Sequence, residues 1–339
     1  MSSTLIVPVA VIEKVSPHPN ADRLEIAQIL GWQVVVPKGQ HFAGQKVVYF
    51  PPDSVLPSEV SDRFGVTQYL SKGRVRCARL RGEPSFGFAV LPDNPDWEVG
   101  ENVAAHYGAV KYEPPLRPGA GDAEQSHPLF VRYTDVENLR NFPDVFQPGE
   151  AVIVTEKIHG TNGRIGIVEG EWMAGSMAVR RKRPADEEMR RSTYWFPHTL
   201  PEVRALMEHA AESHRQTILY GEIYGSSIQS FHYGLKNRIG FAAFDLLVDG
   251  HYLDWPDFAA LCSRFGVPTV PALYDGPYSL DAVRQHAAGQ TTLDDTHIRE
   301  GIVVKPARER TDPRLGRVAL KYLSDEYLLD TKKSDFTDQ

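Results

Sequence analysis

The sequence predicts an α+β protein in two parts, a small N-terminal β-barrel and a larger domain dominated by antiparallel sheet. Short apolar strands separated by turn residues crowd residues 5–50, which is typical of a barrel or sandwich. Residues 113–122 are dense in proline and glycine and offer little to bury, so they indicate a domain boundary. Beyond them, runs of strands with interspersed helices favour the α+β class over repeated strand–helix–strand units.

The composition is that of a globular protein long enough for two domains, since 42% of its 339 residues are hydrophobic and 24% are charged. A net charge of −7 does not favour non-specific coating of nucleic acid, but it allows a local basic groove. No apolar run could span a bilayer and no secretion signal opens the chain, so we expect no membrane partner. The two cysteines, Cys77 and Cys262, indicate neither a disulfide framework nor a structural zinc, and favour a cytoplasmic location.

Residues 1–112 are expected to form the barrel. Its strands are predicted at Leu5–Val15, Leu24–Ile29, Trp32–Val36, Lys46–Phe50, Val75–Leu80 and Phe86–Leu91. Residues 15–25 resemble the opening of tRNA-binding OB-fold modules, which implies an OB-like barrel that binds nucleic acid. Such barrels commonly bind oligonucleotides on one face, although a scaffold that only packs on the second domain remains an alternative.

Two groups of basic residues are candidates for contacts with phosphate, and solvated surface is the alternative for each. They are Lys72, Arg74, Arg76, Arg79 and Arg81 in the first group, and Arg180, Arg181, Lys182, Arg183, Arg190 and Arg191 in the second.

A linker over residues 113–127 is expected to lead into a catalytic domain over residues 128–339. Helices are predicted over residues 201–215 and 256–265, the second capped by Asp254. The other predicted features are a helix capped by Ser279, a hairpin turn at Asp249-Gly250, and strands at Arg164–Val168, Leu219–Tyr224, Ile239–Val248, Ile302–Val304 and Val318–Tyr322.

A lysine at the end of an apolar run is the central feature of this domain. Val152–Val154 predict a buried strand that ends at Lys157, where a rigid element can aim the side chain at a ligand. Gly160 lets a sugar or phosphate approach the backbone closely, and Asn162 can hydrogen-bond a polar ligand. Taken alone, the motif more often marks a surface strand that ends in a salt-bridging lysine.

Five short motifs in this order resemble the nucleotidyltransferase motifs of covalent ligases and capping enzymes. They are Glu156–Asn162, Leu219–Tyr224, Phe241–Leu246, Glu300–Lys305 and Ala319–Tyr322. The first is most similar to phage T4-type nick-sealing RNA ligases and kinetoplastid RNA-editing ligases, and the whole layout resembles the Deinococcus-type RNA ligase clade with its extra N-terminal module. The resemblance implies an ATP-grasp-like antiparallel sheet. Only a short tail follows Lys321, with no room for the C-terminal OB domain of DNA ligases and capping enzymes, which favours an RNA ligase.

The resemblance also implies roles for individual residues. Lys157 would accept AMP from ATP, Lys305 and Lys321 would supply positive charge as further catalytic residues, and Glu300 would hold Mg²⁺ or Mn²⁺. Because an ordinary lysine, with a pKa of about 10.4, is protonated at neutral pH, the site has to lower the pKa of its nucleophile. The nucleotide-binding residues implied are Glu156, His159, Gly160, Asn162, Arg180, Glu222 and Phe244.

Several of these assignments have alternatives. Glu222 would bind the ribose hydroxyls and Phe244 would stack on adenine, and a structural role is the alternative for His159. Arg181 competes with Arg180 for the phosphate contact. The last motif has one lysine where many relatives have two, so phosphate contact rests on Lys321 alone or borrows an arginine such as Arg317.

The sequence therefore predicts a monomeric, ATP-dependent RNA ligase that joins 3′-OH and 5′-phosphate ends through lysyl-AMP and an AMP-capped 5′ end. Its expected partner is RNA, or an RNA-containing duplex with a nick. A capping-type guanylyltransferase is one alternative. Another is a nucleic-acid-binding protein with a degenerate nucleotidyltransferase domain, against which the intact Lys157, Glu222 and Glu300 argue.

Overall fold

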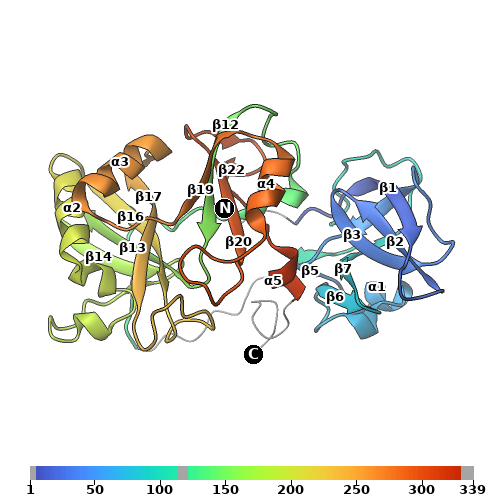
Figure 1. Cartoon of the computed structure of the whole chain (residues 1–339), viewed down its shortest axis with the longest axis horizontal. Helices are drawn as coiled ribbons and strands as arrows, with labels where there is room; N and C mark the ends of the chain where they lie inside the picture. The colour runs from blue at the N-terminus through green and yellow to red at the C-terminus, as the bar shows by residue number, and fades with distance from the viewer. Residues whose placement is uncertain (1–4, 113–120, 330–339) are drawn as a thin grey trace. The chain divides into compact units, whose positions relative to one another are not determined.

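The computed structural model describes residues 5–112 and 121–329, and the chain forms two compact units (Figure 1). The N-terminal unit holds residues 5–112 together with residues 139–143 and 328–329, and the C-terminal unit holds residues 121–138 and 144–327. Across the described residues, no helix is both long and apolar enough to cross a bilayer.

The N-terminal unit is built on a five-stranded antiparallel sheet with the order β3-β2-β1-β4-β8. Its strands are β1 (Val9–Pro17), β2 (Leu24–Ile29), β3 (Trp32–Pro37), β4 (Lys46–Phe50) and β8 (Phe88–Val90). Strand β1 pairs with β4 through residues 9–11 and with β2 through residues 12–17, with an irregularity between Ile12 and Lys14. A bulge of this kind bends a strand so that it can serve two parts of a barrel, and the predicted barrel is confirmed.

Small elements complete this unit. They are β5 (Ser54–Val55) with β9 (Val110–Lys111), β6 (Cys77–Leu80) with β7 (Glu83–Phe86), helix α1 (Ser58–Arg63) and the 3₁₀ turns η1 (Thr67–Tyr69) and η2 (Leu139–Asn141). The strand predicted over Phe86–Leu91 is divided at Gly87, which has a φ of 81°. A Cβ there would lie 2.2 Å from the backbone oxygen of Phe50, so this close approach requires glycine.

Two sheets form the C-terminal unit, and their pairing is antiparallel except between β11 and β23, which confirms the predicted α+β class. The larger sheet contains, in spatial order, β10 (Ala123–Glu124), β15 (Arg180–Arg181), β14 (Glu171–Ser176), β13 (Thr161–Val168), β16 (Gln216–Tyr224), β17 (Gly240–Val248) and β18 (His251–Tyr252). The smaller contains β11 (Glu137–Asn138), β23 (Leu320–Leu323), β20 (Gly301–Pro306), β12 (Ala151–Lys157) and β19 (Ala272–Pro277). Strands β21 (Thr311–Asp312) and β22 (Gly316–Arg317) pair separately.

Helices cover the outer side of the larger sheet. Figure 1 shows α2 (Pro201–Ala211) and α3 (Trp255–Phe265) beside β16 and β17, and α4 (Leu280–Ala287) beside β20. The core between α2, α3 and this sheet includes Leu206, Phe258 and Leu219, all fully buried. The remaining elements are η3 (Met189–Arg191), η4 (Phe196–Thr199) and α5 (Asp325–Leu329).

The helix termini test the predicted caps. Ser279 caps α4 as predicted, because its hydroxyl accepts a hydrogen bond from the backbone of Ala282. Asp254 stands at the N-cap position of α3, but the predicted side-chain cap is wrong. Its carboxylate instead accepts a hydrogen bond from the Glu309 backbone at 2.7 Å, so a tertiary partner outcompetes the local one.

Part of the segment expected to link the domains is structured. Residues 113–120 lie outside the described residues, but Ala123 and Glu124 form β10 and pair with β15. Ion pairs fasten this edge, since Asp122 lies 2.7 Å from Arg181 and Glu124 lies 3.0 Å from Arg180.

Candidate active site

The end of β12 presents the predicted nucleophile. Strand β12 lies between β19 and β20, and Lys157 pairs across the sheet with Gly301. Its Nζ atom lies 2.5 Å from the Oε1 atom of Glu300, whose side chain is 2% exposed against 27% for Lys157. The lysine is therefore half-buried and reachable, and its tip is held on a carboxylate.

Glu300 is buried but charged. Burial alone would raise the pKa of its carboxyl, but the Lys157 ammonium and the nearby His159 ring outweigh burial and leave the pKa lowered. Its second oxygen, Oε2, is buried without a hydrogen bond and lies 3.4 Å from the Nδ1 atom of His159. A buried carboxylate oxygen in this state is suited to a hard cation.

His159 connects Glu300 to residues that none of the five motifs contains. Its Nδ1 atom lies 3.2 Å from the hydroxyl of Tyr327, its Nε2 atom lies 3.4 Å from the hydroxyl of Ser230, and its backbone N–H donates to the hydroxyl of Tyr233 at 2.7 Å. Sequence reasoning missed these three residues, because an isolated serine or tyrosine carries no spacing signal. The ring of His159 is 2% exposed, so it orients Glu300 from the interior.

Glu156 points to the opposite face of β12 from Lys157, because successive side chains of a strand alternate. Its carboxylate accepts hydrogen bonds from the hydroxyl of Thr291 and from the backbone and hydroxyl of Thr292, the last two at 2.9 and 2.8 Å. Arg299 lies 3.5 Å away. Glu156 therefore anchors the strand that carries the nucleophile.

Gly160, Asn162 and Glu222 come together where β13 meets β16. Asn162 pairs with Glu222 across the sheet, and its buried Oδ1 atom has no hydrogen bond. A Cβ on Gly160 would lie 2.3 Å from the backbone oxygen of Ile223 and 3.0 Å from the Cγ atom of Glu222. The glycine is therefore required for the chain to pass over Glu222.

The three predicted catalytic lysines share one face of the smaller sheet. Lys305 pairs with Ile153, and Lys321 pairs with Val303, which itself pairs with Thr155. Cross-strand partners point to the same side, and residues 153, 155 and 157 of β12 alternate onto that side together. Along the strand, however, Lys305 stands four positions from Lys157, about 13 Å at the usual rise.

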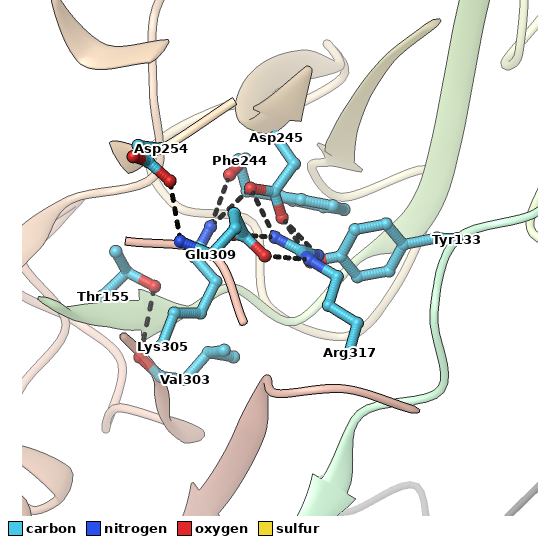
Figure 2. A network of polar contacts seen from close by, with 9 residues as sticks. All are labelled: Tyr133, Thr155, Phe244, Asp245, Asp254, Val303, Lys305, Glu309 and Arg317. Atoms are coloured by element: carbon cyan, nitrogen blue, oxygen red, sulfur yellow. Dashed lines mark hydrogen bonds and ion pairs between the residues drawn. The ribbon is translucent and has the colours of Figure 1, made fainter. Parts of the chain in front are cut away.

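Lys305 lies in a buried network of charges (Figure 2). Its Nζ atom is 2.6 Å from Asp245 and donates to the backbone oxygen of Phe244 at 2.9 Å. Burial lowers the pKa of Lys305, although the Asp245 carboxylate acts in the opposite direction. Its charge is thus already compensated within the protein.

Arg317, which the sequence offers as a possible supplement to Lys321 at a phosphate, completes this network. Its guanidinium makes ion pairs with Asp245 at 3.0 Å and with Glu309, and it hydrogen-bonds Tyr133 at 2.9 Å (Figure 2). It also lies over the ring of Tyr252, 3.8 Å from the centroid. With 8% of its side chain exposed, the arginine is buried, and these two carboxylates compensate its charge.

Two predicted nucleotide-binding residues have other contacts. Phe244 is half-buried and meets Tyr133 edge to face, with ring centroids 4.8 Å apart. Arg180 is half-buried and pairs with Glu124 at the far edge of the larger sheet.

A second cluster of possible metal ligands, His232, Asp294 and His297, lies in the same unit. The Nδ1 atom of His232 accepts a backbone hydrogen bond from Gly234 at 3.0 Å, and the Nε2 atom of His297 accepts one from His232 at 3.2 Å. Each imidazole nitrogen has one lone pair, so the nitrogens nearest Asp294 are already engaged. The cluster serves to hold these loops together.

Comparisons with known proteins agree with this architecture. A family model described as RNA ligase matches residues 150–323, just over half of the chain, and an OB-fold domain model matches residues 6–92. The protein thus combines an N-terminal OB-fold domain with a ligase domain. It belongs to the RNA ligase family.

Solved structures of the Naegleria gruberi RNA ligase share the fold over nearly the whole chain. An apo mutant of that enzyme matches with a TM-score of 0.76 and 24% identity, covering 98% of this chain and 99% of the other. A mutant with ATP and Mn gives 0.75 and 24%, covering 96% and 99%, and the enzyme with PPi gives 0.74 and 24%, covering 96% and 98%. No curated protein matches the sequence.

Proposed function

We propose that the protein is an ATP-dependent RNA ligase that joins 3′-OH and 5′-phosphate ends at nicks in RNA-containing duplexes, as a monomer in the cytoplasm. The observation that carries this proposal is Lys157, half-buried at the end of β12 with its Nζ atom 2.5 Å from the buried carboxylate of Glu300. Membership of the RNA ligase family supports it, as do solved structures of the Naegleria gruberi enzyme with ATP and Mn and with AMP and Mn.

In the first step, the Nζ atom of Lys157 attacks the α-phosphorus of ATP. A phosphorus–nitrogen bond forms, the bond to the bridging oxygen breaks, pyrophosphate leaves, and the lysine loses a proton. Glu300 holds the ammonium tip of Lys157 in place before the reaction. Because that ion pair also favours the protonated, non-nucleophilic form, it has to be broken before attack.

The residues present fit a divalent cation at Glu300. The buried Oε2 atom of Glu300 lacks a hydrogen bond, and magnesium in phosphoryl-transfer sites commonly uses one or two carboxylates together with substrate phosphates. A bound Mg²⁺ or Mn²⁺ would neutralise phosphate charge and disfavour the ammonium form of Lys157. His159 would keep the Glu300 carboxylate oriented from the protein side.

We assign the nucleotide to the junction of β13 and β16. Glu222 would accept hydrogen bonds from the ribose hydroxyls, Gly160 would lie beneath the sugar, and the buried Oδ1 atom of Asn162 is an acceptor that still needs a donor. Phe244 would stack on the adenine ring, and the edge-to-face contact with Tyr133 would hold the Phe244 ring in position. Lys305 would act as a positioning residue, since it holds the backbone oxygen of Phe244.

Two further transfers complete the reaction. A 5′-phosphate oxygen attacks the phosphorus of lysyl-AMP, the phosphorus–nitrogen bond breaks, and Lys157 takes up a proton as it leaves. The 3′-hydroxyl then attacks the phosphorus of the strand's own 5′-phosphate in the AMP-capped end. A phosphodiester forms, a proton is released, and AMP leaves. Lys321, which shares the face of Lys157, is proposed to neutralise phosphate charge in these steps, and Arg180 to contact phosphate at the sheet edge.

Intact-protein mass spectrometry after incubation with ATP and a divalent metal tests the first step. We expect a gain of one AMP that is lost in Lys157→Ala and kept in Lys236→Ala, a control at an exposed lysine of the same unit. Absence of an adduct, after pyrophosphatase treatment and removal of pre-bound AMP, would refute the proposal. A GMP adduct formed from GTP alone would indicate a capping-type guanylyltransferase instead.

A further inference from the structure

Glu300 stands just outside the paired part of β20. The ladder between β12 and β20 ends where Lys157 pairs with Gly301, the residue after Glu300. Pairing with β12 therefore does not by itself fix the carboxylate that lies 2.5 Å from the Nζ atom of Lys157. The chain that enters β20 needs further contacts to hold Glu300 in place.

The backbone at Glu300 and at the preceding residue, Arg299, is bound to neighbouring segments. The backbone N–H of Ser324 donates to the oxygen of Glu300 at 2.9 Å, and the Ser324 hydroxyl donates to the oxygen of Arg299 at 2.9 Å. The backbone N–H of Arg299 donates to the oxygen of Gly289 at 2.8 Å. Both backbone groups of Arg299 are thus engaged, which gives its side chain a defined direction.

The side chain of Arg299 binds the end of helix α4. Its Nη1 atom donates to the backbone oxygens of His286 at 2.6 Å and Ala288 at 3.1 Å, and its Nη2 atom donates to that of Gln290 at 2.9 Å. The last carbonyl groups of a helix lack partners within it and carry the negative end of the helix dipole, so a cation is favourable there. Figure 1 shows α4 beside β20, the strand that follows Arg299.

Arg299 also faces Glu156 on the rear face of the smaller sheet, the face opposite Lys157. Its Nε atom lies 3.5 Å from the Oε2 atom of Glu156, and the two side chains are 10% and 1% exposed, so salt screens this pair little. Lys157 and Glu300 form one acid–base pair on the front face. Their immediate neighbours in the sequence form the second on the rear face, with the charges exchanged between the two segments.

We propose that Arg299 is a positioning residue for Glu300. Its guanidinium ties the entry to β20 both to β12 and to the end of α4, and so keeps Glu300 aimed at Lys157. This role rests on the ligase function proposed above, in which Glu300 holds Mg²⁺ or Mn²⁺. A lysine is a poor substitute, because the planar guanidinium presents five donors in a fixed fork, whereas a single ammonium nitrogen cannot span the helix carbonyls and Glu156 together.

The Mn²⁺ dependence of lysyl-AMP formation, measured in single-turnover assays of the full-length protein, tests this role. Arg299→Lys keeps the charge but should raise the Mn²⁺ concentration for half-maximal rate roughly 10- to 100-fold, the usual effect of losing a residue that orients a metal ligand. A purely structural role would instead reduce the amount of active protein equally at every Mn²⁺ concentration. Ser279→Ala is the matched control, because it weakens α4 at its other end, and its Mn²⁺ requirement should equal that of the unmodified protein.

Amide hydrogen exchange gives a second readout that needs neither metal nor ATP. Exchange over residues 298–302 should be faster in Arg299→Lys and unchanged in Ser279→Ala. Because Arg299 acts in part through Glu156, the double variant Glu156→Gln/Arg299→Lys should raise the Mn²⁺ requirement by less than the product of the two single effects.

Three results would each overturn the positioning role. They are an unchanged Mn²⁺ requirement in Arg299→Lys, unchanged exchange over residues 298–302, and single effects that simply multiply in the double variant. Failure of the unmodified protein to form the adduct at any Mn²⁺ concentration would refute the ligase function instead. Hydrogen exchange would then still decide whether Arg299 fixes the entry to β20.

Discussion

Replacing Asp245 by asparagine removes the one fully buried negative charge between Lys305 and Arg317, and we expect a large loss of stability. Asp245 is 1% exposed and lies 2.6 Å from Lys305 and 3.0 Å from Arg317. Glu309 can compensate the arginine, but Lys305, 2% exposed, has no other carboxylate among the contacts drawn in Figure 2. Breaking one side of a buried ion pair costs about 3–5 kcal/mol, a substantial part of the 5–15 kcal/mol by which a domain is stable.

Urea unfolding at neutral pH measures this loss, with Asp275→Asn as a control. Asp275 is exposed on β19, and its replacement should change the free energy of unfolding by less than about 0.5 kcal/mol. Burial raises the pKa of Asp245, but Arg317 and Lys305 outweigh it and leave the pKa lowered. A lowered carboxyl pKa stabilises the fold at pH values above the unfolded value of about 3.9, and the contribution is lost as pH falls through the folded value.

The difference in the free energy of unfolding between the unmodified protein and Asp245→Asn should therefore be largest at neutral pH and shrink only in acid. A loss below about 1 kcal/mol, or a difference that does not change in acid, would refute the argument. It would mean that water or Glu309 already neutralises the buried cations.

Three further substitutions give separable results. Ser279→Ala removes the cap of α4 and should lower the free energy of unfolding by about 0.5–2 kcal/mol in urea titrations, with lysyl-AMP formation unchanged. Gly160→Ala places a Cβ 2.3 Å from the backbone oxygen of Ile223, so the strand must shift at a cost of about 1–3 kcal/mol. Single-turnover formation of the AMP adduct should therefore slow, and an unchanged rate would contradict the close approach. Glu300→Gln keeps the shape but loses the charge beside Lys157, so adduct formation should fall at low Mn²⁺ and require a higher Mn²⁺ concentration. An Mn²⁺ dependence equal to that of the unmodified protein would exclude Glu300 as the metal ligand.

Local sequence signals predicted much of the fold. Strands β2 and β4 begin and end at the predicted residues, because turn residues on both sides leave the apolar runs little freedom. The same holds for the cap at Ser279, whose partner is three residues away. Asp254 failed as a cap because its competing partner, the backbone of Glu309, is distant in the sequence.

The candidate site likewise contains residues that local motifs predict and residues whose roles depend on tertiary contacts. The motif around Lys157 and the carboxylate of Glu300 were predicted from ordered motifs, and the structure brings these two residues into contact. Tyr327 and Tyr233 could not be predicted, because their roles depend on tertiary contacts with His159 and leave no periodic pattern. Arg317 illustrates the limit most clearly, since a cation beside a phosphate-binding motif is indistinguishable in sequence from one that neutralises a buried aspartate.

The edges of the larger sheet in the C-terminal unit bear on how the protein behaves at high concentration. Both edge strands, β10 and β18, are two residues long, although the central strands β16 and β17 each run for nine. A long, bare edge recruits strands from other molecules, whereas a short one offers too few backbone groups to hold a foreign strand. The residues that fold back from the start of this unit as β10 therefore protect the molecule against edge-to-edge aggregation.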